Sequence, residues 1–169
     1  MSKTLSLAIL FAVSWCLLVS PPPSAAQGVA RNLVDVQWLE RHLNDPDVLV
    51  LDASMGPAYA SAHIPGAVSV NAFVYGGREL PVADAERLYQ SWGVSPTKTI
   101  VLYDTGGSFM ATRLFFSLYY HGFPAAKLVI LDGGLAKWQE AKLPVTKEVP
   151  PAPARGTFAI AKVNEDVRV

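Results

Sequence analysis

The stretch that decides the fold is TIVLYDTGGSF, residues 99–109, which leads directly into an apolar helical pattern over 109–121. Its first five residues form a compact apolar run that is typical of a buried strand. The glycine-rich turn at 104–108 can point several backbone N–H groups inward at the start of the helix, and such groups can hold an anion. The alternative is a tight strand-to-helix turn that binds nothing, since the turn lacks the lysine of a nucleotide-binding loop.

The same alternation of strand and helix extends in both directions from this turn. Strand patterns occupy 48–52, 67–70, 99–103 and 128–131, and helical patterns occupy 34–43, 57–62, 81–92, 109–121 and 135–142. Asp35 is placed to cap the first helix, and Pro81 stands at the first position of the third. Strands that alternate with helices predict an α/β fold, here an open parallel sheet of about five strands with helices on both faces.

Three loops leave strands at the carboxyl edge of this sheet, where α/β proteins bind ligands. The candidate anion-binding loop consists of Asp104, Thr105, Gly106, Gly107 and Ser108. Asp52, Asp132 and Arg113 are candidates for the edge of the site.

The chemistry of these edge residues leaves alternatives open. The three aspartates could hold Mg²⁺ or Ca²⁺, but such residues more often cap the turns that follow them, so neither a metal site nor a cofactor is predicted. Arg113 could reach an anion at the loop, pair with Asp104 or Asp52, or lie exposed on its helix. His63 precedes Ile-Pro-Gly, and we expect it to fix that loop by hydrogen bonding rather than to act as a base.

Composition and charge limit the classes of partner. The chain has 169 residues, of which 51% are hydrophobic, and 14 basic residues balance 14 acidic ones. That length suits one domain plus a short extra segment. The absence of a net charge or a basic run argues against binding to nucleic acid or to anionic lipid.

The first 26 residues have the pattern of a signal peptide. Lys3 precedes an apolar run, and Ser24–Ala25–Ala26 supply small residues for cleavage. A transmembrane anchor is the rival interpretation, but the run is short for a bilayer. We therefore expect export to the periplasm or the medium with no stable membrane anchor after cleavage. Cys16 is the one cysteine of the sequence, so the mature chain would carry no thiol nucleophile.

The sequence after the signal divides into three parts. Residues 27–33 form a lead-in, and residues 34–145 form the predicted domain. Four prolines between Pro144 and Pro153 indicate an extended linker. We therefore interpret 146–169 as a linker and the start of a missing second domain.

Three motifs carry a resemblance to a known family. His63–Val68 (HIPGAV) resembles the "HIPGA" segment of rhodanese-like domains, Val101–Asp104 resembles the strand before their active-site loop, and LDGG at 131–134 with Trp138 resembles their closing element. They occur in the family's order over about residues 33–145. The resemblance is nearest to the non-catalytic N-terminal half of two-domain thiosulfate/3-mercaptopyruvate sulfurtransferases, which shares the Tyr-Asp pair and the spacing from Asp104 to Arg113.

The resemblance implies a sulfurtransferase fold in which active members carry a cysteine directly after the strand tyrosine. That cysteine accepts a sulfane sulfur, and backbone N–H groups hold the persulfide. Asp104 stands at this position, and a carboxylate cannot form a persulfide. We therefore expect no catalytic residue here and an inactive chain, with the Asp104 carboxylate itself accepting the N–H bonds of the loop.

Two functions follow from these expectations. In the first, the chain is the regulatory or structural half of a sulfurtransferase and works with a second, cysteine-bearing rhodanese domain. In the alternative, it is an exported binding module for a small anion or a protein ligand. A truncated product without a function is a third interpretation.

Overall fold

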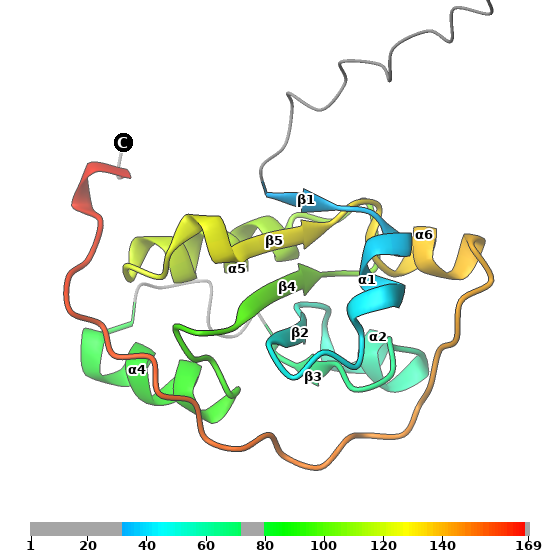
Figure 1. The fold of residues 1–169 in the computed structure, drawn as a ribbon, viewed down its shortest axis with the longest axis horizontal. Coiled ribbons are helices and arrows are strands. Elements are labelled where there is room, and N and C mark those ends of the chain that lie inside the picture. The colour runs from blue at the N-terminus through cyan, green and yellow to red at the C-terminus, as the bar shows by residue number, and fades with distance from the viewer. Residues whose placement is uncertain (1–31, 72–79, 168–169) are drawn as a thin grey trace, which may run out of the picture.

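Five parallel strands form one sheet in the order β1-β5-β4-β2-β3 (Figure 1). The computed structural model describes residues 32–71 and 80–167, so the predicted signal peptide and Cys16 lie outside the described residues. The strands are β1 (Leu33–Val34), β2 (Val48–Asp52), β3 (Val68–Ser69), β4 (Thr99–Tyr103) and β5 (Leu128–Leu131). The helices are α1 (Val36–His42), α2 (Gly56–Ser61), α4 (Val82–Ser91), α5 (Met110–Tyr120) and α6 (Gly134–Glu140), with 3₁₀ turns at Ala125–Lys127 and Glu165–Val167. The predicted α/β fold is confirmed.

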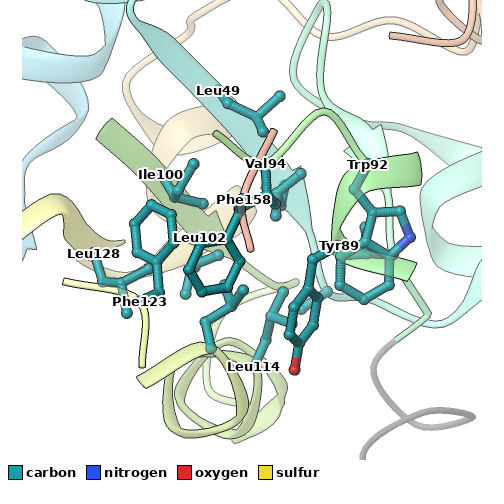
Figure 2. Packing of buried hydrophobic residues seen from close by; sticks show 14 of the residues in the cluster. Leu49, Tyr89, Trp92, Val94, Ile100, Leu102, Leu114, Phe123, Leu128 and Phe158 are labelled. Atoms are coloured by element: carbon teal, nitrogen blue, oxygen red, sulfur yellow. The ribbon is translucent and has the colours of Figure 1, made fainter. Parts of the chain in front are cut away.

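Helices cover both faces of the sheet, because alternate residues of each strand point into two separate hydrophobic clusters. On one face, Leu49 of β2 and Leu102 of β4 pack with α4 and α5 (Figure 2). On the other face, Val101 and Tyr103 of β4 pack with α1 and α6. The central strand β4 is therefore buried from both sides, which explains its continuous apolar run.

The structure refines several predicted boundaries. Asp35 caps α1 as predicted, because its side chain accepts a hydrogen bond of 2.6 Å from the N–H of Trp38. Pro81, predicted at the first helical position, immediately precedes α4, which begins at Val82. Strand β1 was not predicted, since two residues are too few to give a periodic pattern. None of the helices in the described ranges is long and apolar enough to cross a membrane.

The segment 144–164, which we call the strap, continues past the domain end predicted at residue 145 and packs back on the domain. It passes alongside α4 in Figure 1, and Phe158 is buried in the core against Phe123, with ring centroids 5.0 Å apart. The Phe158 N–H donates to Val94 O at 3.1 Å. Gly156 lies so close to Val94 that a side chain would collide with the backbone there. The packed domain therefore includes residues that the proline content suggested were linker.

Replacing Phe158 by alanine tests whether the strap is part of the core. We expect Phe158→Ala to lower the free energy of unfolding by about 3–5 kcal/mol, the usual cost of emptying a buried aromatic site. Val149→Ala is the matched control, because Val149 lies on the same segment but is 70% exposed, and we expect a change within about 0.5 kcal/mol. Urea unfolding followed by circular dichroism measures both. Equal, small effects for the two variants would contradict a structural role for the strap.

Candidate functional site

The loop 104–108 connects the carboxyl end of β4 to the start of α5, and its conformation is fixed by Asp104. Asp104 is buried, with 5% of the residue exposed. One carboxylate oxygen accepts the N–H of Gly106 at 2.9 Å, and the other accepts the N–H of Ala111 at 3.0 Å. A carboxylate between two backbone donors forms charge-assisted hydrogen bonds, which are stronger than bonds between neutral groups. The negative charge also lies at the positive end of α5.

A second loop holds the first in place from the neighbouring strand β5. The N–H groups of Leu135 and Ala136, at the start of α6, donate to the carbonyl oxygens of Asp104 and Thr105 at 2.8 and 3.1 Å. A side chain at Gly134 would collide with the carbonyl oxygen of Asp104. Gly134 of the LDGG motif is therefore needed because the two loops touch there through their backbones.

A hollow of about 130 Å³ lies between these two loops. It is lined by Leu33, Asp104, Gly106, Gly107, Ser108, Ala111, Thr112, Ile130, Leu131, Asp132, Gly133 and Gly134. This set contains two aspartates and no basic side chain. The hollow is therefore electrostatically unfavourable for an anion, in contrast to the anion site that the loop alone suggests.

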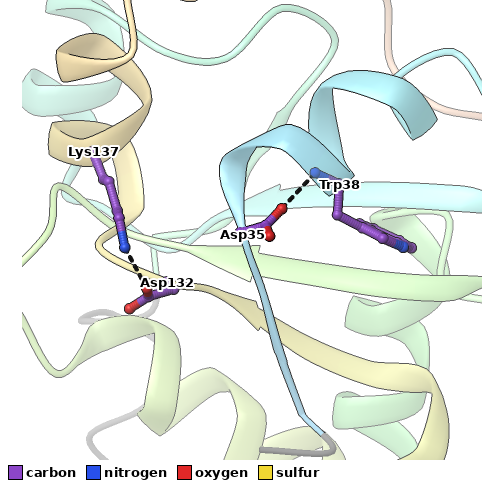
Figure 3. Close-up of polar contacts among 4 residues, drawn as sticks. All are labelled: Asp35, Trp38, Asp132 and Lys137. Carbon is purple, nitrogen blue, oxygen red and sulfur yellow. Dashed lines mark hydrogen bonds and ion pairs between the residues drawn. The ribbon is translucent and has the colours of Figure 1, made fainter. Parts of the chain in front are cut away.

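Asp132 lies at the rim of the hollow and pairs with Lys137 of α6 (Figure 3). The Lys137 Nζ is 2.5 Å from Asp132 Oδ2, and both side chains are about half exposed. The hydrogen bond to Asp132, and then its charge, raise the pKa of Lys137. An ion pair this exposed contributes little to stability, so its main effect is to partly neutralise the rim.

Asp52 does not reach the hollow. It is fully buried, and its Oδ1 accepts the N–H of Ser54 at 2.8 Å. Burial, and then the charge of Asp52, raise the pKa of the Tyr103 hydroxyl. That hydroxyl also accepts the N–H of Ile64 at 3.1 Å. Asp52 and Tyr103 therefore belong to a polar group beneath the His63–Gly66 turn rather than to the rim of the site.

The remaining candidate residues lie apart from the hollow. Arg113 is exposed on α5 and is not part of its lining. Within residues 32–71 and 80–167, the ion pairs are Arg87–Asp84 and Lys137–Asp132, so Arg113 pairs with neither Asp104 nor Asp52. Thr105 is exposed at the tip of the loop. The described residues contain no group of three or more His, Cys, Asp or Glu that could bind a metal ion.

Some residues of the site were not identified from the sequence. Lys137 was not predicted, because its partner Asp132 lies five residues earlier and before the start of the helix. Side-chain pairs within a helix are usually three or four residues apart. Leu33 lines the hollow only because β1 adds to the edge of β5. No local sequence signal marks such a residue, since strand pairing between distant segments brings it there.

The site thus lies in an α/β domain whose glycine-rich strand-to-helix loop, at the carboxyl edge of a parallel sheet, contacts a second glycine pair. This is the arrangement that the resemblance to rhodanese-like domains implies. The comparisons agree with this class. Residues 35–141 match the model of the rhodanese-like domain, and the chain belongs to this family.

Relatives and solved structures extend the comparison. The sulfur carrier protein TtuD of Thermus thermophilus is 31% identical over 146 residues, which cover 80% of this chain and 49% of that protein. The thiosulfate sulfurtransferase of Azotobacter vinelandii is 31% identical over 134 residues, covering 75% and 48%. The crystal structure of the 3-mercaptopyruvate sulfurtransferase SseA from Escherichia coli matches with a TM-score of 0.67 and 30% identity, covering 81% of this chain and 57% of that one. The chain spans about half the length of the curated relatives it matches.

Comparing alanine variants of two adjacent glycines in the loop distinguishes the cost of lost close packing from the cost of backbone strain. Both have positive φ, 94° at Gly106 and 73° at Gly107, but a methyl group at Gly106 would lie 2.6 Å from Gly133 O, whereas one at Gly107 would meet no atom within 4 Å. We expect Gly107→Ala to cost about 1–2 kcal/mol of stability from the left-handed backbone alone. Gly106→Ala should cost about 1–3 kcal/mol more, because the two loops must separate. Thermal unfolding of both variants measures the difference. Equal losses of stability would contradict the close contact between the two loops.

Proposed function

We propose that this chain is the non-catalytic half of a sulfurtransferase, in which Asp104 takes the place of the catalytic cysteine. The observation that carries the proposal is the pair of backbone N–H bonds to the Asp104 carboxylate. In the active members that the sequence resembles, donors of this loop hold an anionic persulfide. Here both donors are already occupied by a charge that belongs to the chain.

The chemistry of the site supports an inactive role. A carboxylate is a poor nucleophile toward sulfane sulfur, and it cannot hold the transferred sulfur atom as a persulfide. The hollow beside the loop is lined by Asp104 and Asp132, so a thiosulfate dianion would meet negative charge. Both effects act in the same direction, against sulfur transfer by this chain alone.

The surface around the hollow supports a role as the partner of a second, cysteine-bearing rhodanese domain. Three large apolar side chains at the carboxyl edge are exposed, namely Leu33 at 48%, Met55 at 55% and Phe109 at 61%. Leu33 lines the hollow, and Phe109 directly follows the loop. Two exposed apolar side chains, one in the hollow and one next to its loop, offer points of contact for a protein partner. The relatives, about twice as long, have room for such a partner in the same chain.

The alternative is an exported module that binds another protein with the same surface. The exposed apolar side chains favour it equally, whereas the two aspartates of the hollow disfavour the small-anion version. In either case we propose that the chain is exported, on the basis of the signal-peptide pattern in residues 1–26. We also propose that it keeps no membrane anchor after cleavage.

A sulfurtransferase assay tests the inactive role. The chain from residue 27 contains no cysteine, so Asp104→Cys introduces its single thiol. We expect no thiocyanate from thiosulfate and cyanide with the native chain, and measurable thiocyanate with Asp104→Cys, because the loop donors are then free to hold a persulfide.

Asp104→Ala is the matched control, since it removes the carboxylate without adding a thiol. We expect it to produce no thiocyanate. Native turnover that persists through further purification would overturn the proposal. If Asp104→Cys folds but gives no thiocyanate, the loop would not be a disabled sulfur site, and the protein-binding alternative would gain.

A binding experiment tests the partner role. We expect the chain to bind the cysteine-bearing half of a two-domain relative, and Phe109→Asp to weaken that binding at least about tenfold. The reason is that a charge would replace an aromatic side chain that the proposed complex buries. Val149→Asp is the control, since Val149 is also exposed but lies on the strap. Isothermal titration calorimetry measures both affinities. Equal weakening by both variants, or by neither, would contradict an interface at the carboxyl edge.

A further inference from the structure

All three histidines of the sequence make the same local contact, but among them His63 also contacts a carbonyl oxygen through its other ring nitrogen. His42, His63 and His121 each place Nδ1 2.7–2.8 Å from the carbonyl oxygen of the residue four positions earlier. In His63 the other ring nitrogen, Nε2, also lies 3.1 Å from a carbonyl oxygen, that of Glu148 on the strap. His63 thus bridges α2 and the strap through both ring nitrogens.

The two carbonyl contacts determine which protonation state fits the site. A carbonyl oxygen only accepts, so each ring nitrogen must carry a proton in order to bond it. A neutral imidazole has one N–H, and each of its two tautomers would leave a nitrogen lone pair facing an oxygen lone pair at 3.1 Å or less. We infer that His63 is an imidazolium that fastens the strap to the domain, and that loss of its proton releases the strap at Glu148.

The surroundings of His63 are compatible with a positive charge. Full burial of the ring disfavours a charge, and the contacts of the ring oppose this cost. The ring stacks on Tyr59 of α2, with centroids 3.8 Å apart and planes 8° from parallel. An aromatic face attracts a cation, and His63 follows the carboxyl end of α2, where a cation is also favoured.

The ionisable groups near the His63 ring include Tyr59 and two residues of the strap. Burial, and then the charge of Asp52, raise the pKa of Tyr59, so this tyrosine stays neutral beside the ring. On the strap, the Lys147 and Glu148 side chains are exposed. The described contacts of the His63 ring nitrogens are the two carbonyl oxygens, so these are the acceptors that select the protonated form.

The contact lies where the strap begins its path around the domain. His63 and Thr146 exchange two backbone hydrogen bonds of 2.9 Å, and the Glu148 N–H donates to Thr146 Oγ1 at 3.0 Å. A hollow of about 270 Å³ is lined there by Pro65, Gly66, Thr146, Glu148 and Pro150. Release at Glu148 would free one wall of this hollow, while Phe158, ten residues further on, keeps the rest of the strap in the core.

Nuclear magnetic resonance of the purified protein tests the inference. Ring ¹⁵N shifts between about pH 5 and about pH 9 follow each histidine through its titration, and amide hydrogen exchange follows the strap. We expect both His63 ring nitrogens to be protonated while the strap is protected. As the proton leaves, the exchange of the Thr146 amide, corrected for its intrinsic pH dependence, should rise about tenfold, the effect of losing one charge-assisted hydrogen bond. The Phe158 amide should not change in this step.

Two variants separate His63 from the other histidines. His42→Gln should keep the pH-dependent step, because His42 has the same local bond and stacks on Trp38 but has no second carbonyl contact. His63→Gln should abolish it, since glutamine does not titrate. If His63→Gln fails to fold, the titration of the native protein decides. A neutral His63 beside a protected Thr146 amide, or constant Thr146 exchange through the titration of His63, would overturn the inference.

Discussion

The backbone N–H groups where β4 turns into α5 need an acceptor, and the site depends on the fact that Asp104 provides one. Its carboxylate receives the Gly106 and Ala111 donors while its own carbonyl receives a donor from the start of α6. One residue therefore joins two loops and two helix starts at the carboxyl edge of the sheet. The close approach of these loops explains why glycines are required on both sides. It also leaves only a small hollow between them.

Under the proposed function, the same interaction accounts for a rhodanese-like fold that carries out no sulfur transfer by itself. An anion-holding loop that is already filled by its own carboxylate is stable and electrostatically satisfied, but it offers nothing to a negatively charged donor. The aspartate at the rim adds to this effect. In that proposal, exposed apolar side chains such as Leu33 at the hollow and Phe109 after the loop are the points of contact for a protein partner.

The strap makes a second set of contacts with the domain, at the His63–Gly66 turn. His63 contacts the strap through its ring and its backbone, and Tyr103 holds the next residue, Ile64, from β4. The HIPGA segment therefore connects the central strand to the strap. A change of protonation at this turn therefore acts on the part of the strap that precedes Phe158, because Phe158 stays in the core.

The sequence by itself determined the class of fold, because the alternation of buried strands and amphipathic helices is a local property that any parallel sheet must satisfy. It also placed Asp35 at a helix start and Asp104 at the end of the central strand. Only the tertiary structure decided that Asp52 is buried beneath the turn, that Lys137 reaches Asp132, and that a two-residue β1 completes the sheet. It likewise decided that a proline-rich strap returns Phe158 to the core. Each of these depends on contacts that local periodicity does not encode, since the burial of a residue is set by whichever distant segment packs against it.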